Sequence, residues 1–372
     1  MLDCLNRFKI ATPSWAYSEG GTRFAIFLDK YAAKTLTDKI EYASQVNQHT
    51  GIAPELSIHI PWDMVDDFDT TREFADTVGI KINAINPNLF QNDAYKYGSV
   101  TNSDPKIRET ALELLYECIE IGKTLKAEYQ SYWFADGTNF PGQADFIKRK
   151  HWMIECLKEV YNKIENYMSI LLEYKFYEPA FYHTDIPDWG TAMMICNKLG
   201  EKAKILVDLG HHPQGTNIEF LVANLIDEGK LGGFHLNSRK YGDDDLTTGS
   251  MNPYELFLIF NELIKGNAAD YKKTSYMLDQ SHYLKPKIEA MIQSVVSAQE
   301  LFTKALLINR NKLKEAQISH DLIKAEECVK EAFYTDVSPL LLYFREINEI
   351  PLNPLQSYLN SGHRKKLRDT II

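Results

Sequence analysis

Eight short β-like runs, separated by stretches with helical periodicity, constrain the fold of this chain more than any other feature. Ile107–Leu115 and Ile218–Ile226 show the helical spacing of apolar residues. Alternation of strands and helices favours a parallel sheet, and eight such units in 372 residues predict one closed (β/α)₈ barrel. The expected strands are Phe8–Pro13, Leu56–Ile60, Ile80–Ile85, Tyr129–Phe134, Met168–Tyr174, Ala203–Asp208, Gly232–Leu236 and Ser275–Leu278.

The residues after the eighth expected strand have helical patterns. Ile288–Leu307 and Ile323–Ala332 are amphipathic, and Ser338-Pro339 begins a third helical run. The predicted fold class is therefore α/β, with a TIM-barrel domain over residues 1–285 and a helical C-terminal extension over residues 286–372. Because a helical tail must bury its apolar face, we expect this extension to contact its own barrel or a neighbouring subunit.

Charge and cysteine usage exclude several classes of protein. The formal net charge of −10 argues against nonspecific binding to DNA or to anionic lipid, since both need clustered Lys and Arg. No apolar run approaches the roughly 20 residues of a membrane span, and Met1–Leu5 lacks the layout of a signal peptide. The five cysteines are scattered, with no CxxC pair, so we expect a reduced, cytoplasmic protein without a nucleic-acid or membrane partner.

Polar residues gather at the ends of the last four expected strands, where the active site of such a barrel is built. Carboxylates dominate and no thiolate takes part, which suits Mn²⁺, Mg²⁺ or Co²⁺ better than a structural zinc. Seven ligands are too many for one ordinary centre, but they suffice for two cations. The candidate metal ligands are Glu173, Asp208, His211, His235, Asp243, Asp245 and Asp279.

Two of these features have simpler explanations that the sequence leaves open. Glu173 and Lys175 lie two apart on one strand, so they face the same side and would form an ion pair. The run Asp243-Asp244-Asp245 would also suit a solvated acidic loop. If this loop contributes to the site, Asp243 and Asp245 point together and Asp244 points outward.

The ends of the first strands carry aromatic residues mixed with His and Asn. Rings cover C–H faces and polar groups bind hydroxyls, so this mixture suits a small polyol. The segments are Ser14-Trp15, His59–Asp63, Asn86–Phe90 and Trp133–Asp136.

Nine longer motifs occur in a fixed order along the chain: Pro13–Trp15, Gly20–Phe24, Ser57–Asp63, Asp136–Gln143, Tyr177–Tyr182, Val207–His212, Gly232–His235, Lys240–Asp245 and Asp279–His282. In these motifs the chain resembles the L-rhamnose isomerase family, in the branch of broad-specificity bacterial aldose–ketose isomerases. A more distant likeness is to xylose isomerases, which share the Glu-x-Lys and Asp-x-Asp arrangements.

The resemblance implies two divalent cations per subunit, with Mn²⁺ as the first choice and Co²⁺, Zn²⁺ or Mg²⁺ as alternatives. A structural cation would be held by Glu173, Asp208, His235 and Asp279. A catalytic cation would be held by His211, Asp243 and Asp245, with Asp208 close to both cations. Lys175, Asp279 and His211 are the implied catalytic residues, and Lys175 would contact the sugar near its reacting end.

The resemblance also implies a homotetramer and a sugar site lined by Trp15, His59, Phe90 and Trp133. Phe24 would extend into the sugar site of a neighbouring subunit. The chain departs from the family in having only about eight residues before its first expected strand, which puts the N-terminal subunit contact in doubt. It also has Tyr174 where the family has a His, and we expect that side chain to point away from the site.

The implied reaction is a metal-assisted hydride shift between C1 and C2 of an aldose, with L-rhamnose and L-rhamnulose as the default pair. D-Allose, L-lyxose, L-mannose and D-ribose are competing substrates. An enediol route, with Asp279 or a metal-bound hydroxide as base, stays open. Alternative functions are an epimerase, a metal-dependent barrel hydrolase such as a nuclease, which the net charge disfavours, and a non-catalytic sugar-binding protein.

Overall fold

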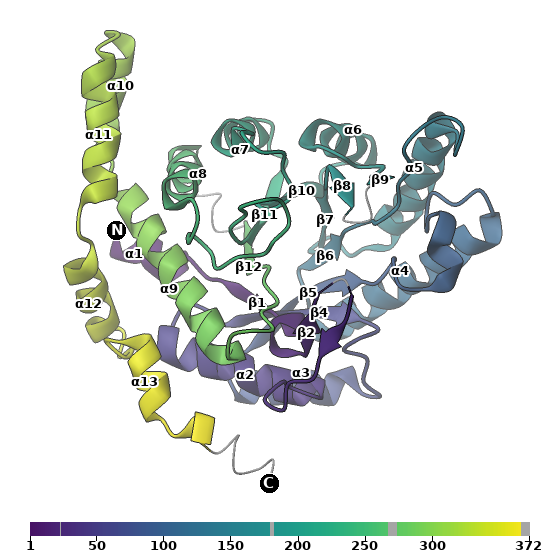
Figure 1. Cartoon of the computed structure of the whole chain (residues 1–372), viewed down its shortest axis with the longest axis horizontal. Helices are drawn as coiled ribbons and strands as arrows, with labels where there is room; N and C mark the ends of the chain where they lie inside the picture. The colour runs from purple at the N-terminus through teal and green to yellow at the C-terminus, as the bar shows by residue number, and fades with distance from the viewer. Residues whose placement is uncertain (23, 179–181, 267–273, 366–372) are drawn as a thin grey trace.

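A computed structural model describes residues 1–22, 24–178, 182–266 and 274–365. It confirms the predicted fold, because eight parallel strands form one closed barrel surrounded by helices (Figure 1). In order around the barrel, the strands are β1 (Ala11–Pro13), β12 (Ser275–Leu278), β11 (Leu231–Leu236), β10 (Ala203–Asp208), β7 (Ser169–Glu173), β6 (Tyr129–Tyr132), β5 (Lys81–Pro87) and β4 (Glu55–Ile60).

The first strand is shorter than predicted. A helix, α1 (Leu2–Arg7), precedes it, and Phe8 is the C-cap residue of that helix. Phe8 and Ile10 are fully buried, and the Phe8 ring stacks on Phe302 with centroids 4.2 Å apart. The apolar run that suggested a longer strand therefore anchors the N-terminus against the helices instead.

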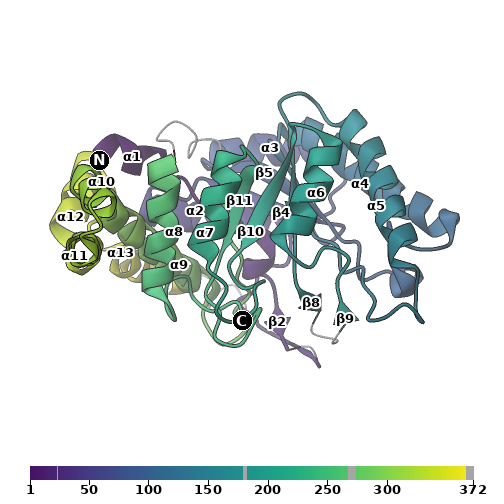
Figure 2. The ribbon, with the colours of Figure 1, turned by 90° about the horizontal axis from the view of Figure 1, so that it is seen from above.

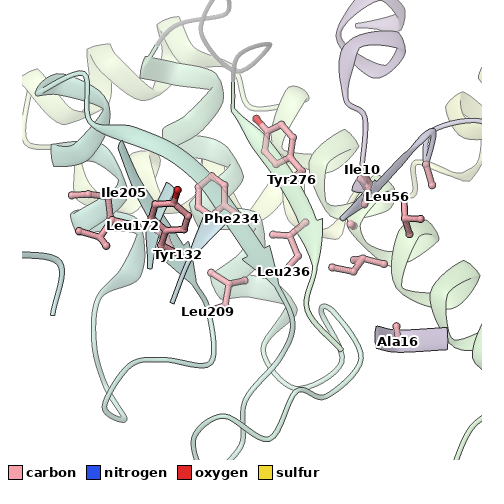
Figure 3. Packing of buried hydrophobic residues seen from close by; sticks show 14 of the residues in the cluster. Ile10, Ala16, Leu56, Tyr132, Leu172, Ile205, Leu209, Phe234, Leu236 and Tyr276 are labelled. Atoms are coloured by element: carbon pink, nitrogen blue, oxygen red, sulfur yellow. The ribbon is translucent and has the colours of Figure 1, made fainter. Parts of the chain in front are cut away.

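Helices that follow the barrel strands form the outer ring. Apolar side chains such as Tyr132, Leu172 and Phe234 are buried in the core that Figure 3 shows. Several of the helices begin at a Thr, Asp or Asn whose side chain accepts a backbone N–H. The ring helices are α2 (Leu36–Thr50), α3 (Phe68–Thr77), α4 (Pro105–Leu125), α5 (Phe146–Lys163), α6 (Trp189–Leu199), α7 (Ile218–Asp227), α8 (Pro253–Gly266) and α9 (Lys287–Leu306). Within the described ranges, no helix is long and apolar enough to cross a membrane.

The helical extension begins with a helix that belongs to this ring. Helix α9 packs against both α8 and α2, so it lies in the eighth position around the barrel. Beyond it, α11 contacts α9, and α13 contacts α2 and α9, so part of the extension covers its own barrel. The division after residue 285 stays a prediction, and residues 366–372 lie outside the described part of the chain. The remaining helices are α10 (Arg310–Ile318), α11 (Leu322–Tyr334), α12 (Ser338–Ile347) and α13 (Pro354–Asn360).

Two short hairpins that were not predicted interrupt the alternation. Strands β2 (Gly20–Gly21) and β3 (Ile26–Phe27) pair after β1, and β8 (Tyr177–Glu178) pairs with β9 (Tyr182–His183) after β7. Figure 2 shows β2, β8 and β9 projecting from the same end of the barrel. Two 3₁₀ turns, η1 (Ser14–Tyr17) and η2 (Asp93–Tyr97), follow β1 and β5. Arg23 and residues 179–181 are outside the described part, so two of the family motifs are described only partly.

Candidate active site

Four side chains from four neighbouring strands meet at the C-terminal end of the barrel. Glu173 ends β7, Asp208 ends β10, His235 lies near the end of β11, and Asp279 follows β12. The parallel register places Asp208 beside His235. Nδ1 of His235 is 3.2 Å from Oε1 of Glu173 and 3.1 Å from Oδ2 of Asp279. One ligand atom from each of the four residues lies within 4.8 Å of the others.

This group has the chemistry of a divalent-cation site. It offers three carboxylates and one imidazole, and Asp208 is fully buried. Burial opposes a positive charge on His235, yet Glu173 and Asp279 raise its pKa well above the ordinary value. Buried carboxylates this close together require a positive charge among them. Glu173, Asp208, His235 and Asp279 therefore fit a divalent cation, and they are the four residues that the family resemblance implied for the structural ion.

The turn after β10 is shaped around Asp208. The backbone N–H of Gly210 donates to Oδ1 of Asp208 at 2.6 Å. A Cβ atom at Gly210 would lie 3.1 Å from that oxygen, so a larger residue there would crowd the Asp208 carboxylate. The same turn carries His211, whose Nδ1 is 3.2 Å from the carbonyl oxygen of Tyr174 and 3.1 Å from Oε1 of Glu173. A backbone carbonyl behind one ring nitrogen leaves the other nitrogen for a ligand.

The acidic loop brings two of its three carboxylates into the site. Oδ1 of Asp243 is 2.8 Å from Nε2 of His211, and Oδ1 of Asp245 accepts from the side-chain amide of Asn237 at 3.2 Å. The same amide donates to Oδ1 of Asp208 at 3.0 Å, so Asn237 links the two groups of predicted ligands.

The third carboxylate, that of Asp244, stabilises the conformation of the loop. Asp244 accepts the backbone N–H groups of Lys240, Tyr241 and Gly242. Asp243 and Asp245 adopt left-handed backbone conformations, with φ of 56° and 41°. Such conformations cost free energy in residues other than glycine, and they often occur at functional sites. The solvated-loop explanation therefore does not describe Asp243 and Asp245, both of which face other charged or polar groups of the site.

The charges in this region leave an excess of negative charge. Burial alone would raise the pKa of Asp243, but His211 and Lys175 lower it to about 2. Burial and the neighbouring carboxylates, Asp243 foremost, raise the pKa of Asp245 well above its ordinary value. A divalent cation relieves this kind of repulsion.

Lys175 is enclosed by opposite charges and by an aromatic ring. Its Nζ is 2.6 Å from Oδ2 of Asp243 and 3.1 Å from Oε2 of Glu178, and it lies 5.0 Å from the centre of the Trp133 ring. Burial lowers the pKa of Lys175, but Asp243 and Glu178 outweigh this effect and raise it. The ion pairs of Lys175 are thus formed with the loop and with β8, and the simple pairing with Glu173 does not describe it.

A cavity of about 280 Å³ opens above these residues. Of the predicted sugar-binding residues, Trp15, His59, Phe90, Trp133 and Lys175 line it. Trp15 also donates from Nε1 to Oδ1 of Asp279 at 3.0 Å. The cavity is lined in addition by Trp62, Asn86, Pro87, Ser131, Glu173, Glu178, His211, His235, Asp243 and Asp279.

Phe24 is the predicted sugar-site residue that this cavity does not include. It follows β2, and its side chain is 82 % exposed. Its role in a neighbouring subunit stays a prediction. Tyr174 is buried behind the site, where its hydroxyl bonds Nε2 of His212 at 2.7 Å, so it points away from the cavity as expected.

Several residues of the site were not assigned a role from the sequence. Asn237 and Ser131 could have been found by strand alternation, because each lies two residues from a predicted site residue, His235 or Trp133. Glu178 comes from the unpredicted hairpin, so no strand pattern indicated that it returns to Lys175.

Comparison with known proteins shows the family to which this barrel belongs. Residues 43–294 match the family model of the xylose isomerase-like TIM barrel. A probable sugar isomerase of Rhizobium meliloti (strain 1021) is 41 % identical over 367 residues, covering 97 % of this chain and 85 % of the relative. The xylose isomerase of Thermus thermophilus is 28 % identical over 203 residues, about half of each chain.

A solved structure shows the same fold at low identity. The structure of L-ribulose 3-epimerase matches with a TM-score of 0.60 and 12 % identity, and the match covers 84 % of this chain and 97 % of the epimerase chain.

The family model spans more than half of the chain, and the probable sugar isomerase matches almost all of it. The chain therefore belongs to the xylose isomerase-like TIM-barrel family, as a relative of sugar isomerases with a group of residues fit to bind a metal.

Proposed function

We propose that this protein interconverts an aldose and a ketose in a metal-dependent reaction, with L-rhamnose and L-rhamnulose as the first pair. The observation that carries the proposal is the division of one cavity into two halves. One half presents carboxylates, imidazoles and Lys175, and the other presents Trp15, Phe90 and Trp133. The similarity to sugar isomerases supports the reaction type. The choice of rhamnose rests on the motif resemblance alone.

The reaction moves the carbonyl group from C1 to C2 without a net change in composition. The hydrogen on C2 passes with its electron pair to C1, the C2 hydroxyl loses its proton as the new carbonyl forms, and the oxygen on C1 gains a proton. Two bound divalent cations would supply Lewis acidity for the oxygens on C1 and C2. Glu173, Asp208, His235 and Asp279 would hold one of them, and His211, Asp243 and Asp245 the other.

The other side chains of the cavity would bind and orient the sugar. The Lys175 ammonium would donate a hydrogen bond to an oxygen at the reacting end of the open-chain sugar. The rings of Trp15, Phe90 and Trp133 would cover C–H faces and exclude water. Asp279 accepts a hydrogen bond from Trp15 Nε1, and in an enediol route it would be a candidate base that removes the proton bonded to C2.

An aldose panel tests the proposed function. The purified protein is treated with a chelator, supplied with Mn²⁺, and assayed for ketose formation from L-rhamnose, D-allose, L-lyxose, L-mannose and D-ribose. Substrate carrying deuterium at C2 separates the two routes, because a hydride shift retains the label in the product and an enediol route exchanges it with solvent. Ketose formation from none of these aldoses would contradict the proposal, and epimerisation of a ketose at C3 would indicate the epimerase instead.

Substitution of single ligands is expected to remove bound metal and activity together. Asp243→Asn or His211→Ala should weaken the catalytic cation, and Glu173→Gln the structural one. Each of the two carboxylate changes removes a full negative charge. We expect turnover to fall by about 100-fold or more, because even mutations of residues that only hydrogen-bond to metal ligands typically cost 10- to 100-fold. Metal analysis of each purified variant measures the effect.

The matched control for these ligand variants is Glu128→Gln. Glu128 pairs with Lys81 at the opposite end of the barrel strands, so its loss should leave both the metal content and turnover near those of the parent. Ligand variants that kept two metals and normal rates would show that the assignment is wrong.

We also expect an oligomer, with a homotetramer as the predicted state. The segment around β3 exposes apolar side chains, with Ile26 at 72 % and Leu28 at 91 % exposed, close to Phe24. Exposed apolar groups gathered in this way are typical of protein interfaces. Light scattering tests this prediction, and a monomer that retains normal activity at nanomolar protein would contradict it.

A further inference from the structure

Behind the rim of the barrel, a fully buried glutamine lies between the segments that carry predicted ligands of both cations. Gln280 directly follows Asp279, a predicted ligand of the structural cation. Its side-chain amide nitrogen donates to Oγ1 of Thr248 at 2.7 Å. Thr248 lies three residues after Asp245, a predicted ligand of the catalytic cation. The amide of Gln280 therefore connects the segment after β12 to the acidic loop.

The hydrogen bonds around this amide form one directed chain. The hydroxyl of Thr248 donates to the carbonyl oxygen of Leu236 at 3.0 Å, so its oxygen is left to accept from Gln280. On the other side of the amide, Oε1 of Gln280 accepts from the hydroxyl of Ser294 on α9 at 2.7 Å, and it lies 3.2 Å from Nε2 of His282. A hydroxyl has one hydrogen to donate. Reversal of the amide would place its oxygen against the Thr248 oxygen, whose hydrogen is already committed, so the chain of bonds sets one orientation.

The carbonyl oxygen of Leu236 brings a third element into the same arrangement. Leu236 ends β11 and follows His235, another predicted ligand of the structural cation. Its carbonyl oxygen accepts the backbone N–H of Asp279 at 3.2 Å, in addition to the hydroxyl of Thr248. The ends of β11 and β12 and the acidic loop are therefore joined at one carbonyl oxygen and one amide group.

The protein encloses this chain of bonds completely. Thr248, Gln280 and Ser294 are fully buried. A buried polar group that loses its partner keeps the full cost of its removal from water, so each of these bonds resists breaking. Within the described ranges, none of the three side chains lines the active-site cavity. Any effect of Gln280 on the site is therefore transmitted through the predicted ligands and does not come from contact with a sugar.

We propose that Gln280 is a positioning residue that holds Asp279 in place relative to the acidic loop, and so couples the two predicted cation sites. The inference rests on the proposed function, because it uses the two-cation assignment. Without the amide, the acidic loop and the segment after β12 can move independently, which misplaces Asp245 and Asp279. Residues that support metal ligands typically change metal affinity by about 10- to 100-fold when they are mutated. We therefore expect Mn²⁺ affinity to fall at both sites.

Titration of the metal-free, full-length protein with Mn²⁺, followed by calorimetry, tests the proposal without depending on turnover. Gln280→Met keeps the length of the side chain and removes both hydrogen-bonding groups, whereas Thr248→Val keeps the shape and removes only the hydroxyl. Both variants should bind two Mn²⁺ ions, each about tenfold more weakly than the parent does. Because both changes break the same bond, the double variant should weaken binding by less than the product of the two single effects.

The matched control is Gln130→Met. Gln130 is as buried as Gln280, and its amide nitrogen donates to the carbonyl oxygen of Cys118, which joins β6 to α4 rather than to a segment with predicted ligands. This variant should melt at a lower temperature than the parent but bind Mn²⁺ equally well. In a parallel assay of ketose formation, Gln280→Met should need more Mn²⁺ for half-maximal turnover, and Gln130→Met should not.

Two results would overturn the inference. Unchanged affinity at both sites, with a lower melting temperature, would mean that Gln280 only supports packing. A loss at one site alone would mean that it holds one ligand segment and does not couple the two. If Gln280→Met does not fold, the same results from Thr248→Val decide.

The parent protein separates failure of this inference from failure of the proposed function. Two bound Mn²⁺ ions and ketose formation by the parent would leave that function intact, whatever the variants do. A parent that binds no Mn²⁺ and forms no ketose would count against the function itself.

Discussion

Removal of divalent metal is expected to abolish turnover completely, and added Mn²⁺ or Co²⁺ to restore it. The reason is the composition of the site: apart from the predicted ligands, Lys175 and its partner Glu178, the cavity is lined by aromatic and neutral side chains. A metal ion contributes several kcal/mol of charge stabilisation in such reactions, which corresponds to rate losses of many thousandfold when it is absent. The measurement is ketose formation after dialysis against a chelator, with metal content determined on the same sample.

The same experiment has a second readout that does not depend on activity. Glu173, Asp208 and Asp279 converge in the folded protein, and a cation that binds only this arrangement stabilises the folded state by an amount that rises with the logarithm of its concentration above Kd. The melting temperature should therefore fall on chelation and rise again with added Mn²⁺. Full activity in a rigorously metal-free sample, with an unchanged melting temperature, would refute the two-cation assignment.

The barrel and its strand-end residues were predictable because one regularity produces both. Parallel strands place their C-terminal ends at the same rim, so Asp208 at the end of β10 and Asp279 after β12 could be assigned to one site before any contact was known. The limits of β10 and β12 agree with the sequence pattern to the residue. The sequence pattern could not predict contacts between side chains of different elements. The hydrogen bonds from Asn237 to Asp208 and Asp245 are one example, since they depend on how the barrel closes.

The parts that were not predicted depend on local backbone geometry rather than on periodicity. Alternation separated Asp244 from the site, but it could not show that Asp244 accepts three backbone N–H groups of its own loop and so helps to fix the positions of Asp243 and Asp245. The β8–β9 hairpin is too short to produce a strand pattern, yet it brings Glu178 to Lys175. Ser131 was missed because a single serine in a strand carries no signal until its hydroxyl is found buried, unpaired and beside a cavity.

Replacement of Lys175 by Met is expected to lower turnover by about 100- to 1,000-fold, the effect of removing one donor aimed at developing charge. Two nearby cations would disfavour the ammonium form of Lys175. However, the five predicted carboxylate ligands carry more negative charge than two divalent cations neutralise, and Glu178 adds another carboxylate at 3.1 Å. In the protein alone, Asp243 and Glu178 already outweigh burial and raise the pKa of Lys175. We therefore expect a protonated donor that orients the sugar rather than a base.

The metal content of Lys175→Met separates this role from that of a ligand. Loss of the ammonium frees Oδ2 of Asp243 without removing any predicted ligand, so bound metal should stay near the parent value while turnover falls. Lys175→Arg should restore little, because a planar guanidinium does not replace a compact ammonium between Asp243, Glu178 and the Trp133 ring. The matched control is Lys202→Met, since Lys202 also lies over an aromatic ring, that of Tyr161, but at the opposite end of the strands. Normal turnover by Lys175→Met would show that this lysine only neutralises its two carboxylates.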